Sequence, residues 1–146
     1  MTMRKVLAAG LVVMGITAPA AAQNVHISKL YEQVLANGEI MGAGFVLDAF
    51  SIQPVYAEQS IRLELNVPRN ASMTLMGDCD DDCADMDMKV YNGAGKQLGE
   101  DVLADPYPIV AFTSDDTGRV ALDLIMNACS TQFCYASYSL FIATGQ

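Results

Sequence analysis

The chain has 146 residues, and its 17 acidic residues outnumber 8 basic ones, for a formal net charge of −9. Such a surface repels phosphate groups, which argues against binding of nucleic acid or anionic lipid. A cation or a basic protein is the electrostatically favoured ligand.

The first residues have the layout of a secretory signal peptide. Arg4 and Lys5 supply a positive start, residues 6–19 form an uncharged apolar run, and three alanines precede Gln23. The run is shorter than the roughly 20 residues that a membrane span needs. We therefore expect removal of residues 1–22, export to the periplasm or the medium, and no stable membrane anchor. Residues 23–146 suit one compact domain, with a helix and a first strand in 23–58 and a sandwich in 59–146.

Residues 24–37 have a helical rhythm. The apolar positions fall near helical spacing, Ser28 is a candidate N-cap, and Gly38 is a stop signal after Asn37. One short amphipathic helix is predicted, whose apolar positions are Val25, Leu30, Tyr31, Val34 and Leu35.

The rest of the chain alternates with a period of two, which is typical of half-buried strands. Turn-forming residues separate the segments, and the turn at residues 68–70 predicts that its two flanking strands pair. Seven or eight short strands of this kind indicate an all-β antiparallel sandwich. The clearest strands are predicted at residues 45–47, 60–67, 72–76, 86–90, 109–112, 120–126 and 135–143.

Four cysteines in an exported chain predict two disulfides. The local pairing, Cys79 with Cys83 and Cys129 with Cys134, is favoured, and it requires a turn between Cys79 and Cys83 because an extended strand would hold their Cα atoms about 13 Å apart. A crossed pairing closes longer loops and would stabilise more, so energetics leave it open. A four-sulfur zinc site has possible spacing but is disfavoured in an oxidising compartment.

Residues 78–88, which we call the acidic segment, hold six of the 17 carboxylates. Calcium takes six to eight oxygen ligands from loops, and a divalent ion would relieve the repulsion within this segment. The alternative is a solvated turn whose aspartates accept hydrogen bonds from the local backbone. The candidate calcium ligands are Asp78, Asp80, Asp82, Asp85, Asp87 and Asp105.

Other chemistry has less support in the sequence. His26 is the only histidine and is expected to be a surface residue near the mature amino terminus. Nucleophilic catalysis lacks a serine or free cysteine near a usable histidine. No tryptophan is present to form a sugar platform. A non-catalytic protein is therefore predicted.

Several short motifs occur along the chain in a fixed order: the acidic segment with its two cysteines, Gly95, the stretch 101–108, Thr117-Gly118, and the residues around Cys129 and Cys134. Together these motifs resemble the bacterial pre-peptidase C-terminal domain family, in particular its small exported stand-alone members. The resemblance covers roughly residues 60–144. It implies a jelly-roll-like β-sandwich without catalysis of its own, and relatives that follow secreted proteases, bind calcium or assist substrate attachment. No protease domain lies in this chain, and Val120 stands where an aromatic residue is common in the family.

The residues and the resemblance together predict an exported, non-catalytic accessory or binding module with an unidentified protein or envelope partner. For the acidic segment, the solvated turn is favoured over a structural calcium site. A calcium-dependent adhesion or protein-interaction domain of the envelope is the alternative, followed by a small envelope hydrolase.

Overall fold

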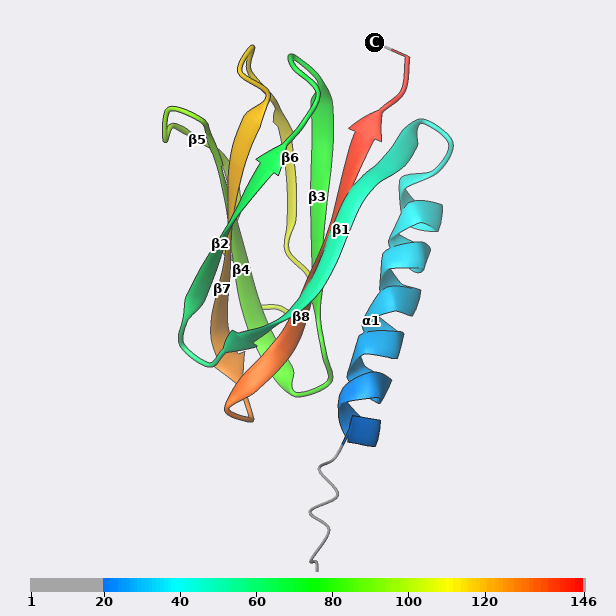
Figure 1. Cartoon of the computed structure of the whole chain (residues 1–146), viewed down its shortest axis with the longest axis vertical. Coiled ribbons are helices and arrows are strands. Elements are labelled where there is room, and N and C mark those ends of the chain that lie inside the picture. The colour runs from blue at the N-terminus through cyan, green and yellow to red at the C-terminus, as the bar shows by residue number, and fades with distance from the viewer. Residues whose placement is uncertain (1–19, 146) are drawn as a thin grey trace, which may run out of the picture.

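The computed structural model describes residues 20–145, and side chains from residue 25 onward. The predicted signal peptide therefore lies mostly outside the described residues, and only its last three residues fall in the first helix. This helix, α1, spans Ala20–Met41, and eight strands follow it (Figure 1). The strands are β1 (Phe45–Tyr56), β2 (Ser60–Asn66), β3 (Ser72–Cys79), β4 (Cys83–Asn92), β5 (Gln97–Asp101), β6 (Ile109–Thr113), β7 (Arg119–Cys129) and β8 (Phe133–Ala143).

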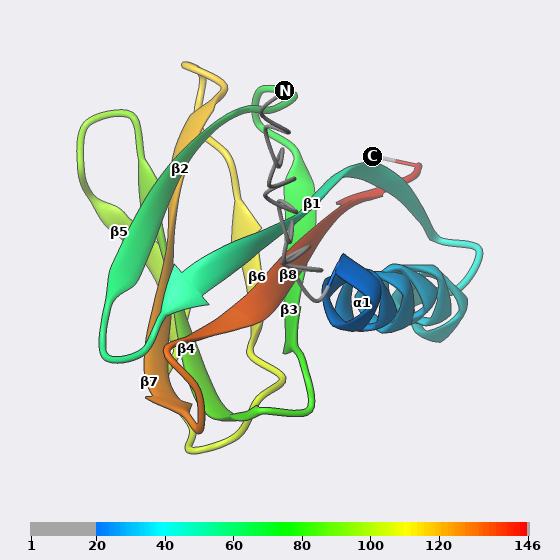
Figure 2. The same cartoon turned by 60° about the horizontal axis from the view of Figure 1, so that its bottom comes forward.

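The strands form two four-stranded antiparallel sheets that face each other, with α1 outside one of them (Figures 1 and 2). The helix-side sheet has the order β1-β8-β3-β6, and the far sheet has the order β2-β7-β4-β5. Successive strands thus enter opposite sheets, except that β4 and β5 pair within the far sheet, which is the jelly-roll arrangement. The prediction of an all-β antiparallel sandwich preceded by one helix is confirmed.

The core lies between the two sheets and is built by the alternation that the sequence displays. In β4, Met86, Met88 and Val90 are fully buried while the residues between them are partly exposed. β7 supplies Leu122, Leu124 and Met126 from the same sheet. Because methionine is flexible and unbranched, it fills the irregular space between two twisted sheets. The methionines of these strands are therefore core residues.

One predicted pairing is wrong and one strand was not predicted. The turn at residues 68–70 does not join a hairpin, because β2 pairs with β7 in the far sheet while β3 pairs with β6 and β8 in the helix-side sheet. A turn sequence specifies a reversal of the chain, but not which sheet the chain then enters. β5 has a single apolar residue, Leu98, so it lacks the alternation that marks the other strands.

Helix α1 is longer than predicted and starts earlier, so Ser28 lies within the helix rather than at its N-cap. It continues through Gly38 and ends before Gly42, whose φ of 75° is the left-handed conformation that ends many helices. Gly38 lies against the sheet, and a Cβ there would be 3.9 Å from the ring of Phe141. Among the described residues, no helix has the length and apolar character to cross a membrane.

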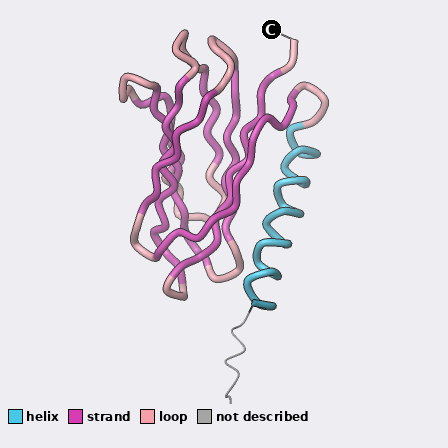
Figure 3. Tube along the Cα trace, in the orientation of Figure 1, coloured by secondary structure: helices cyan, strands magenta, loops and turns pink. Residues whose placement is uncertain are grey.

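The buried face of α1 differs from the predicted apolar face. Leu30 and Val34 are buried, but Val25, Tyr31 and Leu35 are about half exposed. The third buried residue, one turn beyond Val34, is the polar Asn37. The helix covers the outer face of the helix-side sheet beside β1 and β8, as the trace in Figure 3 shows. Ser137, Ser139 and Phe141 of β8 are buried as a result, so both faces of this strand are covered.

Candidate functional site

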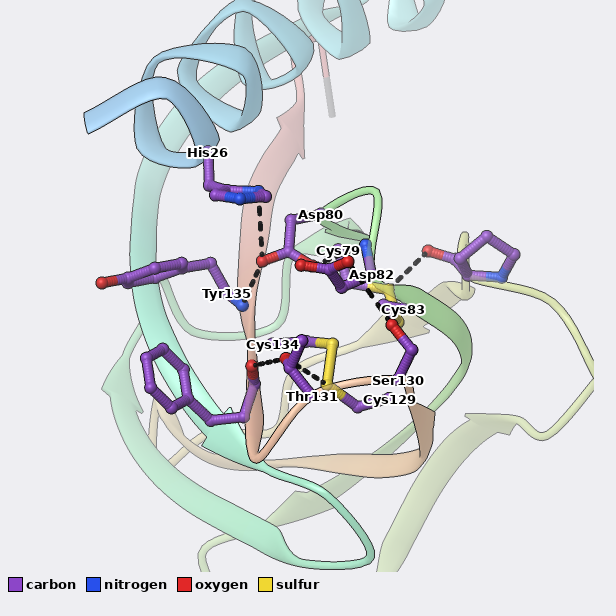
Figure 4. The surroundings of a disulfide bond; sticks show 12 residues. His26, Cys79, Asp80, Asp82, Cys83, Cys129, Ser130, Thr131, Cys134 and Tyr135 are labelled. Atoms are coloured by element: carbon purple, nitrogen blue, oxygen red, sulfur yellow. Dashed lines mark hydrogen bonds and ion pairs between the residues drawn. A yellow bond between two sulfur atoms is a disulfide. The ribbon is translucent and has the colours of Figure 1, made fainter. Parts of the chain in front are cut away.

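Both disulfides lie at one end of the sandwich and join its two sheets (Figure 4). Cys79 at the end of β3 is bonded to Cys83 at the start of β4, and Cys129 at the end of β7 is bonded to Cys134 in β8. The favoured local pairing is confirmed. Because Cys83 is the register partner of Cys129 in the far sheet, the two bridges are neighbours. We call this end, with the turn at residues 80–82, the disulfide corner.

Asp80 holds the turn against the neighbouring strand. Its backbone N–H donates to the carbonyl of Tyr135 at 3.0 Å, and its carboxylate Oδ2 accepts the backbone N–H of Tyr135 at 2.8 Å. Its Oδ1 accepts the backbone N–H of Asp82 at 3.2 Å. The Asp80 side chain is only 4% exposed. This carboxylate is therefore fixed by backbone donors on both of its oxygens.

Asp82 is fixed by the loop of the second disulfide. Its carbonyl accepts the backbone N–H of Ser130 at 2.8 Å, and the hydroxyl of Ser130 donates to Asp82 Oδ1 at 3.4 Å. Each disulfide loop thus contributes to the position of the neighbouring carboxylates, which leaves them little freedom to rearrange.

His26 of α1 points at this turn (Figure 4). Its Nδ1 lies 3.5 Å from Asp80 Oδ2, and its ring lies against the ring of Tyr135, with centroids 6.3 Å apart. The Nδ1 atom is buried and makes no hydrogen bond, although the side chain as a whole is 26% exposed. The prediction of a surface residue is therefore correct only for the outer part of the ring.

The ligand atoms of His26, Asp80 and Asp82 all lie within 4.8 Å of one another. Among the described residues, this is the single group of three or more histidine, cysteine or acidic side chains that comes so close. The arrangement combines one imidazole nitrogen with two carboxylates, which is a donor set suited to a divalent metal ion.

The other predicted ligands do not join this group. Asp78 is buried beneath α1, where its Oδ2 accepts the side-chain N–H of Asn37 at 2.7 Å. Burial raises the pKa of the Asp78 carboxyl, and the hydrogen bond from Asn37 opposes that effect. Asp85 and Asp87 alternate with the buried methionines of β4, and Asp105 accepts the backbone N–H of Tyr107 in a loop. The acidic segment is thus divided among a helix contact, a turn and a strand.

A second link between α1 and the turn is an exposed ion pair. Lys29 donates to Asp81, which raises the pKa of the Lys29 ammonium and lowers the pKa of the Asp81 carboxyl. Lys29 lies one helical turn beyond His26 on α1, and its ammonium group is engaged by Asp81.

Large apolar side chains are exposed along the seam between α1 and β1. The rings of Tyr31 and Phe50 are in contact, with centroids 5.8 Å apart, and the residues are 47% and 44% exposed. Leu35 lies one helical turn after Tyr31, and Leu47 precedes Phe50 in β1; both are exposed. We call these four residues the seam face. The position of Phe50 against the helix has no local sequence signal, because it depends on the packing of α1.

No protein-family model matches the chain, and no curated protein matches it.

Proposed function

We propose that the protein is an exported, non-catalytic binding module that contacts a protein partner through the seam face. The observation that carries this proposal is the contact of Tyr31 with Phe50, two aromatic side chains that pack together and yet remain nearly half exposed. Tyrosine and other aromatic side chains are enriched at the centres of protein interfaces. Exposed rings from two different elements form a preorganised apolar anchor.

The charges around the seam face favour a basic partner. Asp48 follows Leu47 in β1 and is exposed, which places a negative charge beside the seam face. An apolar centre with a charged rim is the usual anatomy of an interface, and the sign of the rim selects the partner and speeds encounter. The overall acidic balance of the chain acts in the same direction.

Export and the absence of catalysis have separate support. Two disulfides indicate folding in an oxidising compartment. All four cysteines are in these bonds, which removes a thiol nucleophile. The resemblance to the pre-peptidase C-terminal domain family adds a class of exported accessory modules with a jelly-roll-like sandwich.

The test is capture of a partner from a cell-envelope extract by the oxidised protein, compared with two matched double variants. Tyr31→Ser with Phe50→Ser removes the anchor, and we expect capture to fall by about thirtyfold, the effect of losing one interface hot spot. Val102→Ser with Leu103→Ser changes equally exposed apolar residues beyond β5, on the edge remote from β1, and should leave capture unchanged. Equal capture by all three proteins would reject the seam face as the binding surface.

A calcium-dependent adhesion domain is the second candidate, because Asp80 and Asp82 are adjacent in one fixed turn. Extracellular calcium modules bind with dissociation constants of about 0.1–1 mM. A thermal melt of the oxidised protein with several millimolar calcium, repeated with chelator, tests this function. An unchanged melting temperature would reject it and would leave the partner proposal intact.

A further inference from the structure

We propose that His26, Asp80 and Asp82 bind a zinc-class divalent transition-metal ion that joins α1 to the disulfide corner. This site goes beyond the proposed partner binding. It shares Asp80 and Asp82 with the predicted calcium site, but it adds His26 and takes a different ion. Its ligands would be His26 Nδ1 and one oxygen from each carboxylate.

The spacing of the donor atoms fits such an ion. Bonds of about 2.1 Å in a tetrahedral site place two ligand atoms about 3.4 Å apart. His26 Nδ1 and Asp80 Oδ2 are 3.5 Å apart, at the limit of a hydrogen bond but close to that edge length. The third ligand atom, from Asp82, lies within 4.8 Å of both.

The buried histidine nitrogen is the second observation that points to a ligand. Nδ1 of His26 has no hydrogen-bond partner although it is shielded from solvent. A buried polar atom without a partner is costly, and a metal ion would supply the missing interaction. The one lysine near the turn, Lys29, is bound to Asp81, so it does not neutralise Asp80 or Asp82.

The carboxylates already have the supporting contacts that metal ligands need. Asp80 accepts the backbone N–H groups of Tyr135 and Asp82, and Asp82 accepts the hydroxyl of Ser130. Such contacts orient ligands and raise metal affinity. Because the two disulfides anchor both loops, little ordering remains to be done when the ion binds.

The donor set selects the class of ion. Calcium and magnesium prefer oxygen ligands, whereas imidazole suits zinc, copper and nickel. Three protein ligands leave a fourth position of a tetrahedral site to water or to a side chain from a partner. The ion would also fasten the first turns of α1 to the sandwich.

The test is calorimetric titration of zinc into the oxidised, chelator-treated protein, with cobalt absorption as a second readout of tetrahedral geometry. We expect one ion per chain and a loss of affinity of at least about tenfold in His26→Ala and in Asp82→Asn. Asp81→Asn is the matched control, because it removes a carboxylate from the same turn that is not a ligand; its affinity should stay within about threefold of the unchanged protein.

Circular dichroism confirms that each variant is folded before titration. The proposal is overturned if His26→Ala binds zinc as tightly as the unchanged protein, if zinc does not bind below roughly 100 µM, or if equimolar calcium displaces it. None of these outcomes depends on capture of a protein partner, so this site and the seam face fail or stand separately.

Discussion

Replacing Asn37 with alanine should loosen the attachment of α1 to the sandwich. Asn37 and Asp78 are 1% and 2% exposed, and the amide of Asn37 is the one side-chain donor to this carboxyl group among the described residues. A hydrogen bond to a charged group contributes about 1.5–3 kcal/mol, and a carboxylate left buried without a donor costs more. We therefore expect Asn37→Ala to cost about 2–4 kcal/mol.

The assay is urea denaturation of the oxidised protein, together with hydrogen exchange of the backbone amides of α1. The exchange measurement matters because a helix held by few contacts can detach without unfolding the sandwich. Gln33→Ala is the control: it lies one turn earlier and touches Asn37 only through a bond of 3.4 Å, so it should cost less than about 0.5 kcal/mol.

A double variant, Asn37→Leu with Asp78→Leu, separates the hydrogen bond from packing. Replacing both partners by apolar groups leaves no polar atom unsatisfied, so its stability should return to within about 1 kcal/mol of the unchanged protein. A stabilising role for this hydrogen bond is excluded if Asn37→Ala costs no more than Gln33→Ala and the amides of α1 exchange at their original rates.

Three further variants test the fold. Replacing Cys129 and Cys134 by serine should cost about 2 kcal/mol in urea denaturation, since the closed loop is short; an unchanged midpoint would contradict this. Gly77→Ala should cost about 1–3 kcal/mol, because the new Cβ would lie 2.9 Å from a proline ring and 3.0 Å from two core methionines, whereas Gly44→Ala meets nothing within 4 Å and should be neutral. Hydrogen bonds from the neighbouring Thr117 lower the pKa of the Asp115 carboxyl in the folded protein. The ionised Asp115 therefore stabilises the fold fully above the ordinary pKa of an aspartate, and this stabilisation is lost as the pH falls through the lowered pKa of the folded state. Asp115→Asn should therefore melt below the unchanged protein at pH 7, with a gap that closes in acid; a constant gap would contradict the assignment.

Alternation predicted the strands whose two faces have different surroundings. In β2 the apolar side chains are partly buried and the polar ones between them exposed, so its limits were nearly correct. β8 was found as well, but its alternation did not indicate that α1 buries Ser137 and Ser139 on its outer face. When a helix from another part of the chain buries a strand, the alternation of apolar and polar residues in that strand does not show it. β5, with one apolar residue, carries no pattern at all.

The candidate site was predicted in part for a similar reason. The local disulfides were favoured over the crossed pairing, and these occur. The acidic segment was chosen as the candidate site, but strand alternation and the turn direct its carboxylates to different places, so only Asp80 and Asp82 stay together. His26 joins them because α1 docks on the helix-side sheet. Only the three-dimensional structure contains that information.

The most direct test of the central claim, that this module binds through the seam face, is a hydrogen-exchange footprint of the captured complex. Within residues 20–145, β1 is an edge strand whose one neighbour in the sheet is β8, so its outer edge is where a partner would change amide exchange. We predict slowed exchange at residues 45–50 of β1 and at the adjoining turns of α1, with no change in β5 of the far sheet. Slowed exchange confined to the far sheet, with β1 and α1 unaffected, would contradict the account.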